Sequence, residues 1–199
     1  MPLDRRDLRR QLLALAARQS GYFTAAQAKE IGYSYQAQKY HVDAGNWRRI
    51  ARGLFRLPEW PVGDHDDLVR WSLWSKERAV VSHETALAVH DLGDVNPRAI
   101  HLTVPDSFGQ EPPSHIVLHR NELDTDDVEG FEGFRVTTPL RSLFDVAGSE
   151  TPQETVDKAV ADALRAGVVS RRQLLRRADE FGPAAALEIE RALASAAAS

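Results

Sequence analysis

Cysteine is absent from the 199 residues, and that absence removes several classes of protein at once. A disulfide framework, a thiolate zinc site, an iron–sulfur cluster and a cysteine nucleophile are all excluded. The fold must therefore depend on a packed core. The composition allows one, because 43% of the residues are hydrophobic and a chain of this length can bury a sizeable interior.

Long apolar runs are missing as well. The sequence contains no stretch of about 18 apolar residues, so it predicts no membrane helix. Its first ten residues are charged, and no apolar stretch with a small-residue cleavage site follows them, which is unlike a secretion signal. We therefore expect a cytoplasmic protein with no membrane partner.

Negative charge is scarce near the amino end. Residues 1–57 hold 11 Lys and Arg against 4 Asp and Glu, a net charge of +7, whereas the remainder holds 14 against 25, a net charge of −11. The formal net charge of −4 thus conceals a basic amino-terminal part followed by an acidic one. Such a division is typical of a chain that binds a polyanion at one end. Chance fluctuation of surface charge is the alternative.

Three short helices are predicted near the amino end. An apolar stripe at helical spacing indicates the first, which should end near residues 20–21: Leu8, Leu12, Leu13, Leu15 and Ala16. Thr24 and Gln27 have the spacing of a capping box, and Gly32 can end the second helix. Ser34 can cap a third helix that runs through Ala44. Tight turns between such helices are typical of a helix-turn-helix.

The hydrophobic period changes from helical to strand-like after the third helix. Apolar residues flank an Arg52–Gly53 turn in the segment NWRRIARGLFRLP, which predicts a two-stranded wing. Pro58 and Pro61 then mark a change of composition. We expect a winged helix-turn-helix domain over residues 1–57 and a second domain over residues 62–199.

The second part of the chain has mixed patterns. Asp64, Asp66 or Asp67 can cap a helix that runs to about Lys76, and AVVSHETALAVHDLG predicts a buried strand and a helix capped by Ser82. Strands are expected in AIHLTV and HIVLH, and a hairpin in VEGFEGFRVTT. Four helices should follow, over 139–147, 152–166, 170–181 and 183–197. The predicted class is α+β, with the winged helix-turn-helix followed by a mixed α/β domain to about residue 138 and a helical segment after it.

One face of the third helix carries the chemistry that base recognition needs. An arc of about 140° on the helical wheel is shared by Tyr35, Gln36, Lys39, Tyr40 and Asp43. Gln36 can pair with adenine, Lys39 can reach guanine or a phosphate, and the tyrosines can donate to phosphates or stack. Gln38 and His41 fit the opposite, buried side poorly, which leaves the rotation of this helix open by about one residue.

Cations surround that helix on the first helix, the second helix and the wing. They can bind phosphates without reading sequence, and Arg52 at the wing tip is placed to reach a minor groove. An interaction module built on the same fold is the alternative. The candidate DNA-binding residues are Arg5, Arg6, Arg9, Lys29, Ser34, Tyr35, Gln36, Lys39, Tyr40, Arg48, Arg49, Arg52 and Arg56.

Other clusters of His, Asp and Arg residues could belong to an enzyme or a metal site, but the spacing of their residues does not favour either interpretation. His83 and His90 are seven residues apart, too far for an H-E-x-x-H zinc motif. The run 64–67 is typical of a helix cap, and the acidic residues at 124, 126 and 127 are typical of a solvated turn. The basic cluster at 171, 172, 176 and 177 can be a solvated face or can touch DNA or a toxin. We predict no metal or cofactor site and no catalytic residue, although a catalytic site without a motif stays open.

Three segments resemble the AbiEi family of antitoxins: GYFTAAQAKEIGYSYQAQKYHVDAGNWRRIARGLFRLP, VVSHETALAVHDLG, and RVTTPLRSLFDVAG with the following DALRAGVVSRRQLL. The resemblance implies an antitoxin that represses its own operon through the winged domain. It also implies a carboxyl-terminal domain that counteracts an AbiEii-type nucleotidyltransferase toxin, directly or indirectly. By position, Tyr35, Gln36, Lys39, Tyr40 and the wing arginines become DNA contacts. The third helix departs from the family pattern, since aromatic and amide residues replace arginines and aliphatic residues.

The expected partners follow from this resemblance. They are double-stranded DNA of the chain's own promoter region and the toxin, with cooperative or dimeric binding to DNA left open. Two alternatives remain from the residues. The chain can be an enzyme that neutralises a toxin by covalent modification such as phosphotransfer, or a transcriptional regulator that is not an antitoxin.

Overall fold

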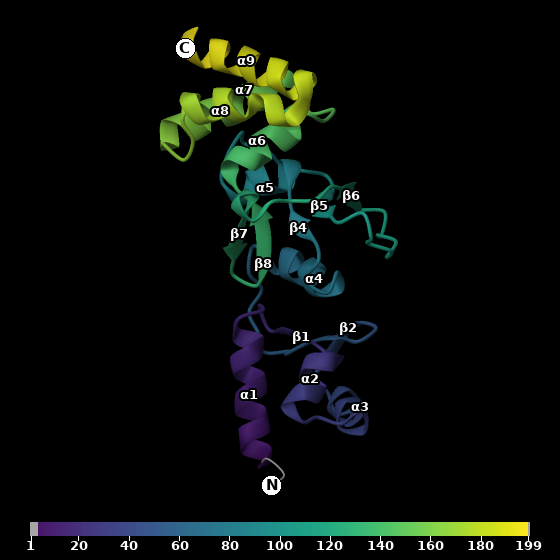
Figure 1. Ribbon diagram of the computed structural model, residues 1–199. Helices are drawn as coiled ribbons and strands as arrows, with labels where there is room; N and C mark the ends of the chain where they lie inside the picture. Colours follow the sequence, from purple (N-terminus) through teal and green to yellow (C-terminus); the bar gives the residue numbers. More distant parts are fainter. Residues whose placement is uncertain (1–3, 199) are drawn as a thin grey trace. The chain divides into compact units, whose positions relative to one another are not determined.

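The computed structural model describes residues 4–198, which form two compact units (Figure 1). The first unit comprises the chain up to Glu77 together with Gly130–Phe134. The second comprises Arg78–Glu129 and Arg135 onward. Each unit has its own hydrophobic core.

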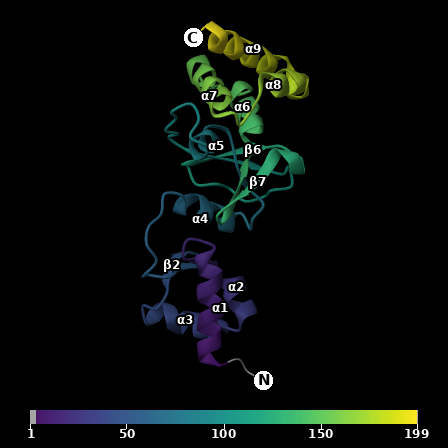
Figure 2. The same cartoon turned by 90° about the vertical axis from the view of Figure 1, so that its left-hand side faces the viewer.

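The first unit is a winged helix-turn-helix with one additional helix. Its helices are α1 (Arg5–Ala17), α2 (Ala25–Ile31), α3 (Tyr35–Asp43) and α4 (Asp66–Trp74), and its strands are β1 (Tyr22–Thr24), β2 (Arg48–Ala51) and β3 (Leu54–Arg56). The strands form an antiparallel sheet in the order β1-β3-β2. Figure 1 shows α1 beside the pair formed by α2 and α3, and in Figure 2, turned by 90°, α1 lies in front of them.

Local capping determines the helix boundaries of this unit. Thr24 and Gln27 form the predicted capping box, with Thr24 Oγ1 accepting from the Gln27 backbone N–H at 3.1 Å. Ser34 Oγ accepts from the backbone N–H of Ala37 at 3.2 Å and so starts α3. Gly32, with a φ of +123°, ends α2 in a conformation that a side chain would strain. The predicted helices are therefore confirmed.

An aromatic cluster joins the sheet to the helices. The Trp47 ring meets Phe23 edge-on with centroids 4.8 Å apart, and it stacks on His41 at the same distance. Tyr33 and Phe55 complete the cluster around Trp47. Aromatic contacts of this kind add stability beyond the area they bury. They connect the carboxyl end of α3 to the wing strands, so the helix and the wing keep a defined relation.

The second unit combines a mixed sheet with a helical subdomain. The sheet is formed by β4 (Val80–Val81), β5 (Ile100–Val104), β6 (Ile116–Arg120), β7 (Val128–Phe131) and β8 (Phe134–Thr137), in the order β6-β5-β4-β8-β7. The hairpin tip Gly130–Phe134, which joins β7 to β8, belongs to the first unit. The β4 strand pairs antiparallel with β5 and parallel with β8, and β5 pairs parallel with β6. Its helices are α5 (His83–Val89), α6 (Pro139–Ala147), α7 (Gln153–Ala166), α8 (Arg171–Arg177) and α9 (Gly182–Ala198), with short 3-10 turns η1 (Thr125–Asp127) and η2 (Ala178–Phe181). The predicted α+β class is confirmed, including its helical carboxyl-terminal segment.

Apolar faces of α5 to α9 form the core of this helical subdomain. The α7 helix contributes Val156, Ala159, Val160 and Ala163, each at most 1% exposed. These positions repeat every three or four residues, which is the stripe expected of an amphipathic helix packed on one side. The small side chains allow α9 to approach α7 closely. No helix within residues 4–198 is both long and apolar enough to cross a membrane.

The boundary of the first unit does not lie at the two prolines. The α4 helix belongs to this unit, where His65 packs on Phe131 and Phe134 and Asp66 pairs with Arg56. The predicted caps Asp64, Asp66 and Asp67 do not cap α4, because His65 is the N-cap residue and no side-chain cap bond forms. The division into a domain over 1–57 and a second domain over 62–199 stays a prediction.

Candidate nucleic-acid interface

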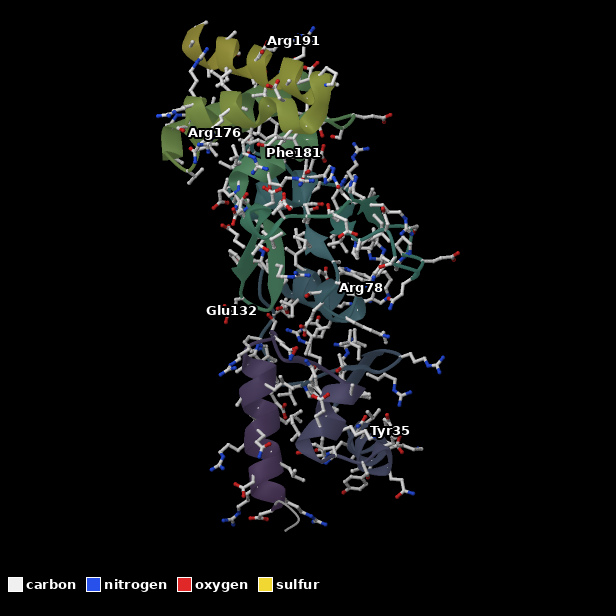
Figure 3. The ribbon with its side chains drawn as sticks, in the orientation of Figure 1. Tyr35, Arg78, Glu132, Arg176, Phe181 and Arg191 are labelled. Carbon is white, nitrogen blue, oxygen red and sulfur yellow. The ribbon has the colours of Figure 1, made fainter. Side chains whose placement is uncertain are left out.

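The polar face of α3 is exposed, as the sequence predicted. Tyr35 and Tyr40 are 63% and 66% exposed, and Gln36, Lys39 and Asp43 are exposed beside them. Figure 3 labels Tyr35, which extends outward from α3. An exposed face with amide, ammonium and phenol groups supplies both donors and acceptors for base edges and phosphates.

Gln38 determines the rotation of α3, which the sequence left open. Its side chain is 3% exposed, and Nε2 donates to the backbone oxygens of Ala25 and Tyr33, each at 3.0 Å. A buried amide is tolerated when its hydrogen bonds are satisfied. Burial also lowers the pKa of His41, which keeps that ring neutral against Trp47. Both misfit residues therefore lie on the packed side of the helix.

Two of the candidate cations on this surface, Lys39 and Lys29, interact with neighbouring side chains. Lys39 Nζ forms an ion pair with Asp43 Oδ2 at 2.5 Å, one turn along the exposed face. Lys29 lies over the ring of Tyr35, 5.2 Å from its centroid. The first contact reduces the charge that α3 presents, and the second connects α2 to the start of α3.

The first helix presents arginines with no competing carboxylate. Arg5, Arg6 and Arg9 are exposed, and among residues 4–198 none of them forms an ion pair. Arg10 differs, because its guanidinium meets Asp7 at 2.9 Å. Unpaired surface guanidinium groups are the ones that can neutralise phosphates without first losing a partner.

The wing displays three further arginines. Arg48 and Arg49 lie on β2 and Arg52 in the turn before β3, and all three are exposed. Gly53, with a φ of +73°, allows that tight turn. A register shift between Arg49 and Ala51 bulges β2, and the Arg49 guanidinium lies 5.9 Å from the Phe55 ring centroid.

Arg56 is placed differently from the other predicted contacts. Its guanidinium pairs with Asp66 and donates to the backbone oxygens of Ser20 at 3.2 Å and Pro61 at 2.9 Å. The side chain is 13% exposed. Because its Nε and Nη2 atoms donate within the first unit, Arg56 connects the wing to α4, and its predicted phosphate contact stays a prediction. Its partner Asp66 lies ten residues further along the chain, so the sequence did not distinguish Arg56 from the exposed arginines of the wing.

The acidic turn near residue 127 is also unlike its sequence-based interpretation. Asp127 is 2% exposed and accepts from Arg177 at 2.6 Å and from Arg141 at 3.0 Å. Burial would raise the pKa of Asp127, but the hydrogen bonds from both arginines outweigh it and hold the pKa below its usual value. The prediction of a solvated turn is therefore wrong for Asp127. Arg177 of the basic cluster on α8 is engaged in an ion pair with it.

Two histidines of the second unit make hydrogen bonds within that unit. His90 Nε2 lies 2.7 Å from the Thr137 backbone oxygen, and His83 Nδ1 lies 2.9 Å from Ser82 Oγ. Ser82 stands at the N-cap of α5 but makes no cap bond, because its hydroxyl instead accepts from Thr103 at 2.8 Å. Within residues 4–198, no group of three or more His, Asp or Glu is arranged to hold a metal ion.

Comparisons with known proteins agree with this architecture. The crystal structure of the RV2827C protein from Mycobacterium tuberculosis is similar, with a TM-score of 0.63 at 14% sequence identity over 98% of this chain and 79% of that one. At such an identity the similarity concerns the fold alone. The comparison with curated proteins gives no match.

Family models match both parts of the chain. The model described as a transcriptional regulator, AbiEi antitoxin, matches residues 10–58, and that of the AbiEi antitoxin C-terminal domain matches residues 79–194. The second match alone covers more than half of the chain, so the resemblance seen in the sequence is confirmed. The chain belongs to the AbiEi family of antitoxins and transcriptional regulators.

Proposed function

We propose that the chain represses its own operon by binding promoter DNA through the first unit. In this proposal α3 enters the major groove with Gln36 and Lys39 toward the base edges and Tyr35 and Tyr40 near the flanking phosphates. The observation that carries the proposal is the exposed polar face of α3, bordered by arginines that lack ion-pair partners among residues 4–198.

The surrounding cations are assigned to the DNA backbone. Arg5, Arg6 and Arg9 on α1 and Lys29 on α2 contact phosphates on one side of the groove. The wing extends to the other side, where Arg48 and Arg49 meet the backbone and Arg52 reaches the minor groove. Ser34 caps α3 through its oxygen and keeps its hydroxyl proton to donate to a phosphate.

The second unit is proposed to counteract a nucleotidyltransferase toxin of the AbiEii type in the cytoplasm. The match of the AbiEi antitoxin C-terminal domain to residues 79–194 supports this role. Direct binding and indirect neutralisation are distinguished by measuring complex formation between purified toxin and the full chain. Rescue of toxin-arrested growth by the full chain without a detectable complex would indicate the indirect route.

A salt-titrated band shift tests DNA binding. The full chain is mixed with its own upstream DNA or with a scrambled duplex of equal length. We expect specific binding, and the logarithm of the binding constant should fall linearly with the logarithm of salt, with a slope of about 0.9 for each phosphate neutralised. Equal affinity for both duplexes, or affinity that does not change with salt, would contradict the proposal.

A further inference from the structure

A cavity of about 570 Å³ opens between α1 and α3 in the first unit. Its walls come from α1, from the turn before α3, from α3 itself and from the residues that flank the wing. A space of this size is in the range of small-molecule sites, which run from about 300 to 1,000 Å³. We name it the α1–α3 groove.

The interior of the α1–α3 groove is apolar and aromatic. Leu8, Leu12 and Leu13 line it from α1, and Tyr33 and Trp47 line it from the other side. Leu12 and Trp47 are core residues, exposed by 2% and 4%, whereas Leu13 at the edge is 41% exposed. Apolar side chains therefore line the groove from the hydrophobic core to the surface. A ring-shaped ligand can pack against them on more than one side.

Positive charge borders this apolar interior. Arg5 and Arg9 lie one helical turn apart on α1 and both line the groove. Glu59 is the carboxylate among the lining residues, and neither arginine forms an ion pair with it or with any other group of residues 4–198. His41 also lines the groove but is kept neutral, because burial lowers its pKa. The excess charge at the border is therefore positive.

The phenol of Tyr33 adds a polar group without a partner. Tyr33 is 7% exposed, and within the described part of the chain its hydroxyl makes no hydrogen bond. Arg9 lines the same groove, and burial raises the pKa of Tyr33 in spite of the opposing charge of Arg9. A protonated hydroxyl and a guanidinium that line one groove can both donate to an acid group.

We propose that the α1–α3 groove binds a small aromatic acid. Its rings pack between Leu12 and Trp47, and its acid group accepts hydrogen bonds from Arg9 and Tyr33, with Arg5 adding charge. A small anion is favoured over an apolar peptide because the donors without partners lie at the border of an apolar space. The occupied groove would also neutralise two arginines that the proposed function assigns to phosphates, so the ligand would weaken DNA binding. That consequence rests on the proposed function, whereas ligand binding itself does not.

The test uses two dyes that differ in one acid group. 1-Anilinonaphthalene-8-sulfonate carries the rings and the anion, and N-phenyl-1-naphthylamine carries the rings alone. We expect the sulfonate to bind the full chain at one saturable site, by fluorescence titration, and to bind about tenfold tighter than the neutral dye. Equal affinities, or a signal that does not saturate, would overturn the proposal.

Matched variants locate the dye. Arg9→Gln removes a lining charge, whereas Arg6→Gln removes an exposed charge of α1 that lies outside the lining. We expect Arg9→Gln to weaken sulfonate binding about tenfold and Tyr33→Phe about threefold, with Arg6→Gln close to wild type. Neutral-dye binding should not change in Arg9→Gln. Equal effects of Arg9→Gln and Arg6→Gln would place the dye elsewhere and overturn the proposal.

Two further measurements separate the remaining interpretations. Concentration-dependent dimerisation that blocks the dye, and that Leu13→Glu abolishes, would identify a second copy as the occupant and would overturn the proposal. In a band shift, sulfonate at a concentration that half-saturates the wild-type groove should weaken the binding of wild type to promoter DNA and have a much smaller effect on Arg9→Gln. If wild type bound no DNA at all, the proposed function would fail, while the dye titration would still decide whether the groove is a ligand site.

Discussion

The guanidinium of Arg56 pairs with the carboxylate of Asp66, and the two side chains are only 13% and 10% exposed. Arg56 also donates to the backbone oxygens of Ser20 and Pro61. Arg56 thus connects β3 to the start of α4. Arg52, four residues earlier in the wing, is exposed to solvent. The two residues therefore provide a matched comparison between a structural arginine and a proposed DNA contact.

Replacing each of these arginines with methionine should affect different properties. Arg56→Met leaves the carboxylate of Asp66 without its partner, so we expect the free energy of unfolding to fall by about 3 kcal/mol. Arg52→Met should change stability by less than about 0.5 kcal/mol but weaken DNA binding by about 1 to 3 kcal/mol. Urea unfolding and band shifts measure the two effects. If Arg56→Met kept full stability and lost DNA affinity as Arg52→Met does, the structural role of Arg56 would be wrong.

The ion pair between Lys39 and Asp43 predicts opposite effects for its two members. Lys39→Ala should weaken DNA binding by about 1 to 3 kcal/mol, because α3 loses a groove contact. Asp43→Asn should strengthen binding about threefold, because Lys39 is released and a negative charge leaves the recognition face. Both residues are exposed, so neither change should lower the melting temperature. Weaker binding by Asp43→Asn would mean that α3 does not face the phosphates.

Gln38 should matter for stability rather than for base recognition. Gln38→Leu removes the donor to the backbone oxygens of Ala25 and Tyr33, and both carbonyls lose that hydrogen bond. We expect a loss of about 1 to 3 kcal/mol in the free energy of unfolding, measured with urea. Gln36→Leu on the exposed face is the control, with a stability change below about 0.5 kcal/mol. Similar losses in the two variants would contradict the observed rotation of α3.

The parts of the fold that local chemistry determines could be predicted from the sequence. The capping box of Thr24 and Gln27 and the helix Pro139–Ala147 are found where the pattern placed them. The three-residue strand β1 was missed, because its partner β3 lies about thirty residues further along the chain and a short strand has no period of its own. The parallel pairing of β5 with β6 could not be predicted either, because the hydrophobic pattern indicates which residues are buried but not the relative direction of two strands.

The candidate site was predictable to the same extent. The exposed face of α3 follows from helical geometry, so its residues could be named in advance. Arg56 could not be separated from Arg52, since its partner Asp66 is brought to it by the fold. Asp127 is a second case, because its partners Arg141 and Arg177 are 14 and 50 residues away in the sequence. The α1–α3 groove could not be predicted from the sequence, because a cavity depends on how the helices pack.

A stack of histidines in the second unit predicts how stability depends on pH. The His83 and His119 rings stack with centroids 3.4 Å apart, and His101 Nδ1 lies 3.0 Å from His119 Nε2. Burial, and then the neighbouring imidazoles, lower the pKa of His83 to about 3 and that of His119 to about 4. The unfolded chain takes up these protons near pH 6.5 and the folded chain does not. The contribution of these histidines to stability is therefore complete above that pH and is lost as the pH decreases toward the two folded-state values.

The comparison that isolates this effect is His119→Phe, which keeps a ring in the stack but cannot bind a proton. Each proton taken up on unfolding contributes a slope of at most about 1.4 kcal/mol per pH unit, so the variant should lose less stability than wild type between about pH 6.5 and pH 4.5. Asp145 acts in the opposite sense, because burial raises its pKa to about 6 and its ionisation lowers stability as the pH rises. Wild type and His119→Phe share the contribution of Asp145, so it cancels when one slope is subtracted from the other. Urea unfolding across this range measures the slopes, and equal slopes would show that His119 is already protonated in the fold.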